Sequence, residues 1–314
     1  MYKIKQFPED FKVNEVMDLR YSINGRYSYV LLEKKNLNTI DAIQKIANSL
    51  KINKKRIGFA GNKDKNAITK QHISIFDIPK QTIDSIKIDN IKIKFLGYGD
   101  KPISLGDHKY NEFKIIVRNL RIASKPIDFI ENYFDEQRFS TKNPFIGKLI
   151  LKKEFEKVSK LINFEIKDIK KLKFYLHSYQ SYLFNQVLSL YLKDRFKDYF
   201  RIEYSLGDFI FLRKKPKNFK IPLMNFDTIF ENNEIERLYT KILNKEDIKK
   251  EDFLIRSIPN LVSETFYRNT FVDLAIKSKF LKDELNKDKF KQVLKFKLPK
   301  GSYATIVVKK MFSR

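Results

Sequence analysis

One carboxylate flanked by two lysines could do chemistry in this chain. It lies in a segment with the sequence GFAGNKDKNAITKQ, from Gly58 to Gln71, which holds two of the nine glycines in 314 residues. Asp64 stands between Lys63 and Lys65, and neighbouring positive charge favours the ionised form of a carboxylate. An ionised carboxylate can attack carbon as a nucleophile. On spacing alone, a solvated acid in a surface turn explains Asp64 equally well.

The elements around this segment could hold Asp64 in a loop. Residues 56–60 are short, apolar and partly β-branched, which is typical of a strand, and residues 72–78 alternate apolar and polar side chains as a half-buried strand does. Upstream, Thr39 predicts the N-cap of an amphipathic helix that ends near Leu50. We expect this helix to pack on the sheet and to lead the chain to the Asp64 loop.

The Asp64 segment resembles the signature of the TruD family of tRNA pseudouridine synthases, in its archaeal or eukaryotic-like form. The shared pattern is Gly-x-Ala-Gly-x-Lys-Asp-Lys-x-Ala-x-Thr-x-Gln, which covers fourteen contiguous positions and includes the acid itself. The resemblance implies that Asp64 is the catalytic nucleophile.

A second match lies near the N-terminus. The run Pro-Glu-Asp-Phe-x-Val-x-Glu that begins at Pro8 resembles the N-terminal motif of the same family. In that family a lysine three residues before the proline pairs with the catalytic aspartate, and the matching residue here is Lys5. Without the resemblance, Lys5 would be one more surface lysine.

A third match opens the strand predicted over residues 111–119. Alternation with period two puts Asn111, Phe113, Ile115 and Val117 on one face. Taken alone, this pattern favours Phe113 as a core residue and Asn111 as a turn residue. Asn-x-Phe at a strand start is also TruD-like, and the resemblance implies that the pair contacts the catalytic aspartate and the target base.

Residues 130–140 carry a fourth match, to the family pattern Asn-Tyr-Phe-Gly-x-Gln-Arg-Phe-Gly. Asp135 and Ser140 stand where the family has glycines. If those glycines serve a positive φ or a close backbone approach, the local path differs here. The resemblance gives these candidate RNA-binding residues: Lys63, Lys65, Gln137 and Arg138.

Patterns at both ends of the chain indicate β structure. Strands are expected over residues 11–15 and 28–33, and Asn-Gly at 24–25 predicts a hairpin between them. Residues 293–298 and 302–308 predict two further strands joined by a short turn.

The middle of the chain changes to helices with basic faces, predicted over residues 152–162 and 168–196. The run Leu-Pro-x-Gly-Ser-Tyr-Ala-Thr that begins at Leu298 is again TruD-like. The resemblance implies an α+β fold: a pseudouridine synthase fold with a largely antiparallel mixed sheet, plus an inserted α+β (TRUD) domain. The predicted domains are a discontinuous catalytic domain, 1–140 with 266–314, and the insert, 141–265.

The charge balance points to a polyanionic partner. Lysine and arginine number 64 against 38 acidic residues, for a formal net charge of +26. Such an excess favours nucleic acid first and an anionic membrane surface second. Lysine is abundant throughout, so the sign of the charge is more informative than its size.

Several classes of protein are disfavoured. The chain has no cysteine, which excludes disulfides, thiolate nucleophiles and cysteine-based metal sites. His72, His108 and His177 are far apart and form no zinc pattern. No apolar run approaches a membrane span, and the N-terminus lacks the apolar core of a signal peptide. We expect a soluble cytoplasmic monomer that binds tRNA and uses no metal, cofactor or membrane.

The reaction that the resemblance implies is isomerisation of a uridine in tRNA, at position 13 in this family. The C1′–N1 bond breaks, the uracil turns, and C5 bonds to C1′, so nothing is oxidised or hydrolysed. Asp64 either attacks carbon or removes a sugar proton, while Lys5 and Asn111 orient it. A non-catalytic tRNA-binding protein or RNA chaperone with the same basic cleft is the alternative. A metal-dependent nuclease would need clustered carboxylates, and the loop has one.

Overall fold

The structure, a computed structural model, describes residues 1–140, 142–162, 168–258, 261 and 265–313. The chain forms two compact units, each made of two segments. The first unit comprises Met1–Asp128 and Leu274–Gly301, and the second comprises Phe129–Asp273 and Ser302–Arg314. The domain division at 140/141 and 265/266 stays a prediction, and residue 141 lies outside the described residues.

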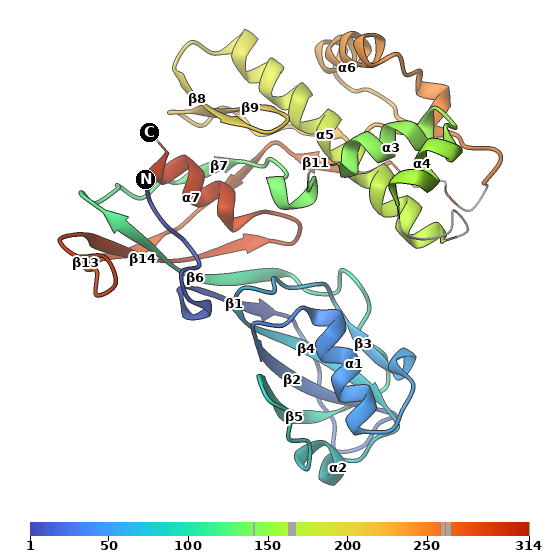
Figure 1. Ribbon diagram of the computed structural model, residues 1–314, viewed down its shortest axis with the longest axis vertical. Helices are drawn as coiled ribbons and strands as arrows, with labels where there is room; N and C mark the ends of the chain where they lie inside the picture. The colour runs from blue at the N-terminus through green and yellow to red at the C-terminus, as the bar shows by residue number, and fades with distance from the viewer. Residues whose placement is uncertain (141, 163–167, 259–260, 262–264, 314) are drawn as a thin grey trace. The chain divides into compact units, whose positions relative to one another are not determined.

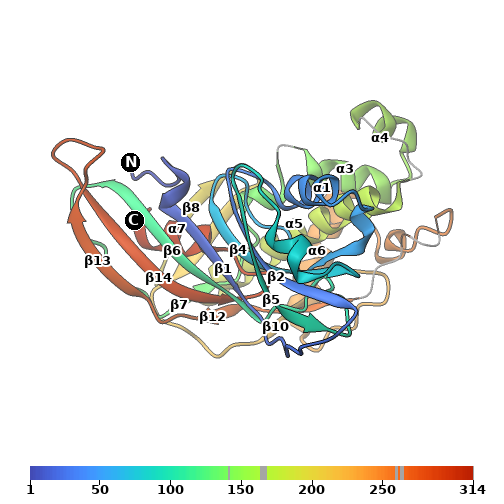
Figure 2. The same ribbon diagram turned by 90° about the horizontal axis from the view of Figure 1, so that it is seen from below.

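The first unit is built on one mixed sheet whose strands come from both of its segments (Figure 1). The strands are β1 (Phe11–Val16), β2 (Tyr27–Lys35), β3 (Ile57–Phe59), β4 (Ile68–Phe76), β5 (Ile91–Gly99), β6 (Tyr110–Leu120), β13 (Lys277–Lys282) and β14 (Phe290–Pro299). Their order is β13-β14-β6-β1-β4-β2-β5, with β3 paired to β4, and Figure 2 shows β13, β14, β6 and β1 side by side. β1 and β4 are parallel, whereas the other described pairs are antiparallel. The predicted α+β class with a largely antiparallel mixed sheet is confirmed.

A helix covers one face of this sheet. α1 (Thr39–Ser49) buries an apolar stripe that includes Ile43 and Ile46 against the sheet residues Val30 and Leu32. Its N-cap is Asn38, one residue before the predicted cap, because the Thr39 hydroxyl is used elsewhere (see below). The remaining short helices of the unit are η1 (Pro8–Asp10), η2 (Lys54–Arg56) and α2 (Lys80–Asp84).

The predicted hairpin between the first two strands is wrong. β4 lies between β1 and β2 and pairs with both of them. Gly25 is explained instead by a close approach of two backbones, because a Cβ on Gly25 would lie 2.7 Å from the main-chain nitrogen of Gly99. The pairing of strands distant in sequence overrides the local turn signal.

The second unit combines helices with short two-stranded sheets. Its helices are η3 (Glu136–Arg138), α3 (Asn143–Leu151), α4 (Phe155–Leu161), α5 (Ile169–Arg195), α6 (Asn233–Glu246), η4 (Lys250–Phe253) and α7 (Ala304–Phe312). Its strands are β7 (Phe129–Glu131), β8 (Tyr199–Tyr204), β9 (Gly207–Leu212), β10 (Lys220–Pro222), β11 (Tyr267–Asn269) and β12 (Phe271–Asp273), which pair as β7–β12, β8–β9 and β10–β11. The long predicted helix is α5, capped by Asp168, whereas the region predicted as one helix over 152–162 holds only α4.

The last element is a helix where we predicted a strand. α7 buries Ile306, Val307 and Val308, a β-branched run that periodicity alone cannot assign to a strand or a buried helix. The helix also carries Lys310 to the buried Glu131 of β7, with Nζ 3.0 Å from Oε2. This buried ion pair requires Lys310 to face inward with the apolar residues.

Candidate active site

Asp64 lies in the loop between β3 and β4 with its carboxylate half open to solvent. Its Oδ2 is 2.8 Å from Nζ of Lys5, and the two side chains are 32% and 16% exposed. Among the residues that the structure describes, Lys5 is the one polar partner of this carboxylate. The Lys5 ammonium also lies 4.3 Å from the ring centroid of Phe11. The structure thus brings Lys5 and Asp64 together across 59 positions of sequence.

The backbone at Lys5 is strained. Its φ is +55°, in the left-handed region, which costs an ordinary side chain roughly 1–2 kcal/mol. The flanking residues hold this conformation: Lys3 exchanges two backbone hydrogen bonds with Arg118, and the Phe7 amide donates to Asp10 at 3.2 Å. Strain of this kind persists where the surroundings enforce it, often at functional sites. Here it accompanies the placement of the ammonium against Asp64.

The buried side chain of Lys34 binds main-chain carbonyl groups of the Asp64 loop. Lys34, on β2, is fully buried, and its Nζ donates to the carbonyl oxygens of Leu37 at 2.5 Å and Asp64 at 2.9 Å. The carbonyl of Lys63 lies 3.4 Å away. Burial lowers the pKa of Lys34 to about 8, although the negative charge of Asp64 opposes this shift. The Lys34 ammonium therefore anchors the loop by its backbone, and the Asp64 carboxylate is left to pair with Lys5.

The same loop is tied to α1 and β4 through two buried side chains. The Lys63 amide donates to Oγ1 of Thr39 at 2.9 Å, and that hydroxyl donates to Gln71 at 3.0 Å. Gln71 in turn donates to the carbonyl of Gly61 at 3.2 Å. Thr39 and Gln71 are 1% and 0% exposed, so water does not compete for these bonds. Together with Lys34 they fix the path of the loop on both sides of Asp64.

The side chain of Lys63, a candidate RNA contact, is buried and paired with a carboxylate. Its side chain is 6% exposed, and its ammonium lies 2.7 Å from Oε2 of the fully buried Glu15. Burial would raise the pKa of Glu15, but hydrogen bonds from His72 and the charge of Lys63 outweigh it and leave that pKa lowered. Because its ammonium is buried against Glu15, Lys63 is not available to bind an RNA phosphate in this arrangement. Lys65, by contrast, is exposed.

Asn111 and Asp64 form no hydrogen bond with each other in the described part of the chain. Its Nδ2 lies 3.4 Å from Nε2 of His108, and within the described residues its buried Oδ1 has no hydrogen-bond partner. His108 in turn approaches the loop, because a Cβ built on Gly61 would lie 3.6 Å from its Cε1. Burial and the Lys63 charge lower the pKa of His108. The structure therefore links Asn111 to the Asp64 loop through a histidine.

Phe113 joins an aromatic cluster that reaches Lys5. Its ring stacks on Phe296, with centroids 5.5 Å apart, and meets Phe11 edge-on at 6.1 Å. Because Lys5 lies over Phe11, contacts run without a break from Asp64 to Phe113. The Phe113 side chain is only partly buried, so part of it stays accessible.

The two remaining candidates lie in the second unit. Gln137 is exposed, and the guanidinium of Arg138 lies 5.5 Å from the ring centroid of Phe174. Burial lowers the pKa of Arg138.

The two departures from the family pattern have different consequences. Ser140 adopts a φ of +46°, so it keeps the left-handed conformation that a glycine would favour. Asp135 binds α7 instead, with its carboxylate 2.9 Å from Nζ of Lys309 and 2.8 Å from Oγ1 of Thr305.

Sequence reasoning missed Lys34, Thr39, Gln71 and His108 as parts of this site. Only Lys34 left a clear signal, because Val30, Leu32 and Lys34 occupy alternate positions of one strand and a lysine thus follows two apolar residues on the inner face. The described residues include no group of three or more acids and histidines arranged to hold a metal ion. None of the described helices is long and apolar enough to cross a membrane.

Comparison with known proteins identifies relatives along the whole chain. The family model "tRNA pseudouridine synthase D (TruD)" matches residues 2–171 and 210–311. The "Probable tRNA pseudouridine synthase D" of Nanoarchaeum equitans is 30% identical over 99% of this chain and 98% of its own, and the "tRNA pseudouridine synthase D" of Aquifex aeolicus is 28% identical over 99% and 98%. The crystal structure of a TruD protein from Methanosarcina mazei superposes with a TM-score of 0.69 at 25% identity, covering 99% of this chain and 93% of that one.

Proposed function

Because the chain belongs to the TruD family of tRNA pseudouridine synthases, which are isomerases, we propose that it converts a uridine of tRNA to pseudouridine with Asp64 as the catalytic carboxylate. One observation carries the assignment to Asp64: its half-exposed carboxylate pairs with Lys5 at 2.8 Å in a loop whose backbone is anchored by Lys34. Such an arrangement fixes a reactive group while leaving it accessible. By family resemblance, the target is uridine 13.

The reaction needs one bond to break and another to form at the same sugar carbon. The C1′–N1 bond breaks, C5 bonds to C1′, C5 loses a proton and N1 gains one, so the atoms of the nucleotide are conserved. Asp64 acts either by attacking C1′ or by removing a sugar proton. Lys5 supplies a positive charge beside Asp64, which offsets repulsion between the carboxylate and the phosphates of the RNA.

The target uridine must leave its stack, at a cost of a few kcal/mol. The accessible part of Phe113 would offset some of this cost by stacking on the extruded base. The Oδ1 of Asn111 is buried and lacks a partner within the described residues, so the amide would have to turn towards solvent to accept a hydrogen bond from a base edge. The proposed RNA contacts are Lys65, which is exposed in the Asp64 loop itself, and Gln137 and Arg138 in the second unit. A cytoplasmic, monomeric enzyme without a cofactor and the domain division predicted above belong to the same proposal.

Substitution of Asp64 tests the proposal. Purified protein, without added metal or nucleotide, is incubated with a tRNA transcript, and pseudouridine is mapped position by position. Wild-type protein and Asp89→Asn, an exposed acid outside the site, should form pseudouridine, and Asp64→Asn should not. Affinity of Asp64→Asn for tRNA should stay within several-fold, because cationic contacts supply most of the binding.

Two outcomes would contradict the proposal. Turnover by a clean Asp64→Asn preparation would remove Asp64 from the mechanism. Tight tRNA binding by the wild-type protein with no pseudouridine at any position would favour the non-catalytic RNA-binding alternative.

A further inference from the structure

Four lysines form a row across four neighbouring strands of the first unit. Lys12 of β1 pairs with Lys114 of β6, Lys114 pairs with Lys295 of β14, and Lys295 pairs with Lys277 of β13. Residues that face each other in a ladder project from the same side of the sheet. Lys114, Lys277 and Lys295 are exposed, and Lys12 is partly exposed. We call these four residues the lysine row.

The lysine row lies on the sheet face opposite to the candidate active site. Phe11, Phe113 and Phe296 alternate with its members along β1, β6 and β14, and these phenylalanines form the cluster that reaches Lys5 and Asp64. Successive side chains of a strand point to opposite faces. The lysine row is therefore a separate surface from the one that presents the Asp64 carboxylate.

The strand register places the four positive charges next to one another, and their repulsion destabilises the sheet unless an anion binds. Directly opposed side chains have Cβ atoms about 4.5–5.5 Å apart, and like charges placed so destabilise a sheet. None of the four lysines takes part in an ion pair in the portion of the chain that the structure describes.

Other lysines of the same sheet are paired with acids, one of them two positions along β14 from the lysine row. Lys70 lies opposite Glu33 with their charged atoms 3.1 Å apart, and Lys297 lies opposite Glu112 with a separation of 2.8 Å. The four lysines of the row differ from these lysines in having no acidic partner among the described residues, and a lysine-rich composition does not by itself explain that difference.

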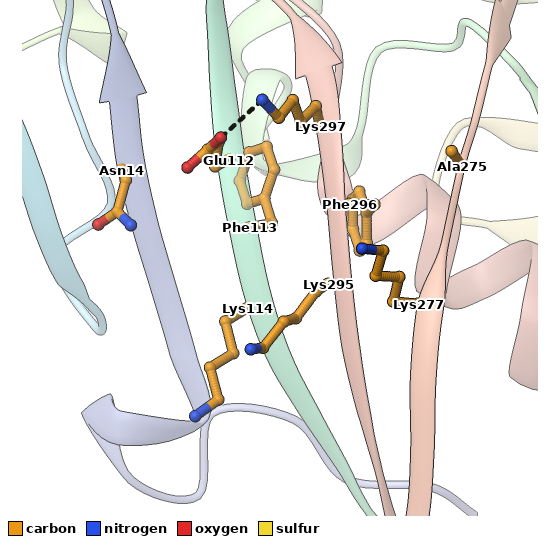
Figure 3. Close-up of a pocket in the computed structure, with 9 residues that line it drawn as sticks. All are labelled: Asn14, Glu112, Phe113, Lys114, Ala275, Lys277, Lys295, Phe296 and Lys297. Atoms are coloured by element: carbon orange, nitrogen blue, oxygen red, sulfur yellow. Dashed lines mark ion pairs between the residues drawn. The ribbon is translucent and has the colours of Figure 1, made fainter.

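A groove of about 600 Å³ runs along this surface. Figure 3 shows Lys114, Lys295 and Lys277 on neighbouring strands beside it, and Lys297 turned to its partner Glu112. The lining residues that share the face of the lysine row, or lie beside it, are Asn14, Glu112, Lys114, Ala275, Lys277, Lys295 and Lys297. Phe113 and Phe296, which neighbour Lys114 and Lys295 along β6 and β14, also line it. The surface is thus a hollow with three exposed ammonium groups that lack acidic partners among the described residues.

We propose that the lysine row is a second binding surface, for the phosphodiester backbone of RNA. With strands about 4.8 Å apart, four strands span roughly 14 Å, which suits a chain of phosphates better than a single anion. Lysines bind phosphates as point charges and impose no base sequence. A hollow receives a rod-like polyanion, whereas a flat anionic bilayer would contact protruding side chains. The proposal takes tRNA as the RNA from the proposed function, but it concerns binding alone.

A charge-matched comparison tests the proposal. The test variant combines Lys114→Gln, Lys277→Gln and Lys295→Gln. The control combines Lys87→Gln, Lys92→Gln and Lys94→Gln, which removes three exposed charges at the β5 end of the same sheet. The dissociation constant of an unmodified tRNA transcript is measured for both between 50 and 200 mM salt. The test variant should bind at least tenfold more weakly than the control, and its slope of log K against log salt should be shallower by about 2.

Further readouts separate this surface from the fold and from catalysis. The test variant should keep its circular dichroism spectrum, because the substitution relieves repulsion at exposed positions. Its single-turnover rate with saturating enzyme should stay within twofold of wild type if Asp64 acts on the other face. A wild-type protein that binds tRNA but forms no pseudouridine would remove the proposed function and leave this binding comparison intact.

Equal tRNA affinity and equal salt slope for the test and control variants would overturn the inference. Binding to vesicles of anionic lipid that is lost only in the test variant, with tRNA binding unchanged, would also overturn it and assign the surface to membranes.

Discussion

At the scale of single residues, different side chains hold the backbone of the Asp64 loop and bind the Asp64 carboxylate. Lys34 and Thr39 bind backbone atoms of the loop, whereas Lys5 binds the carboxylate itself. The anchors are fully buried and the carboxylate is not. Each of these side chains can therefore be removed with a distinguishable effect on the site.

Removal of Lys5 should slow catalysis more than removal of a surface charge. Exposed pairs are worth about 0–1 kcal/mol and broken buried pairs cost about 3–5 kcal/mol, and the exposures of 16% and 32% place this pair between those limits. Lys5→Met should therefore lower the single-turnover rate roughly tenfold to a hundredfold. Lys5→Arg should recover only part of the loss, because a planar guanidinium does not replace a compact ammonium.

The measurement uses saturating enzyme, so that weaker RNA binding does not lower the observed rate. Lys3→Met, which changes an exposed lysine two residues away, is the control. A wild-type rate for Lys5→Met would mean that the ion pair has no part in the reaction.

Lys34 should make the rate sensitive to alkaline pH. Its pKa is lowered to about 8, so the ammonium that anchors the loop becomes a neutral amine as the pH rises above 8. The wild-type rate should fall over this range, and Lys34→Met should start lower and lack that fall.

The contribution of Lys34 to the free energy of unfolding should rise over the same pH range in which the rate falls. The pKa of Lys34 is lower in the folded protein than the ordinary value of 10.5, so the unfolded chain binds more protons between about pH 8 and 10.5. This group therefore adds stability as the pH rises. A rate that falls in step with the melting temperature would contradict the anchor and indicate unfolding.

At the scale of elements, one arginine connects three parts of the first unit. Arg118 of β6 is 4% exposed and binds Asp10 of η1 through two of its nitrogens, at 3.0 and 2.8 Å. It also binds Asp283, in the turn between β13 and β14, at 2.8 Å. Because Lys3 pairs with the backbone of Arg118, this cluster also holds the segment that carries Lys5.

Arg118→Met should lower the free energy of unfolding by about 3–5 kcal/mol, because it leaves two buried carboxylates without their cation. Denaturant unfolding measures the loss, and Arg121→Met, at an exposed arginine nearby, should change stability by less than about 0.5 kcal/mol. Equal stabilities of the two variants would contradict the role given to Arg118.

The same cluster predicts acid sensitivity. Burial would raise the pKa of Asp283, but hydrogen bonds from Asn119, Leu285, Asn286 and Arg118 lower it to about 2. Its contribution to stability is therefore present above about pH 4 and is lost as the pH falls towards 2, and this loss should be smaller in Arg118→Met.

Helices and strands with a clear hydrophobic period were easier to predict from the sequence than the pairing of strands in the sheet. The alternation in β6 and the stripe of α5 are both in the structure, and the α6 stripe at Ile235, Leu238 and Ile242, capped by Asn232, was readable but missed. β4 pairs with both β1 and β2 through contacts between residues far apart in sequence. The local Asn-Gly turn signal could not show this, and it wrongly predicted a hairpin between β1 and β2. The Lys5–Asp64 pairing came from family resemblance. The inward position of Lys34 was readable from the alternation of its strand, but its bonds, like those of Thr39, go to backbone atoms of a loop distant in sequence, and no residue pattern predicts such bonds.

At the scale of the whole molecule, the charge of +26 should govern RNA binding. Each neutralised phosphate releases counterions, so affinity for tRNA should fall by roughly two or more orders of magnitude between 50 and 200 mM salt. Filter binding over that range measures the slope. A flat profile would mean that the basic residues reflect composition and do not contact phosphates.

The two-segment construction of the first unit also governs how the sheet is completed during synthesis. β6 ends at Leu120 and its neighbour β14 begins at Phe290, about 170 residues later. At 5–20 residues per second, a ribosome leaves one edge of β6 without that partner for roughly 9–34 s. An open strand edge invites pairing with other chains. A nascent chain therefore carries its Asp64 loop in an unfinished sheet until β14 emerges, and a chain interrupted before that point would become an aggregation hazard.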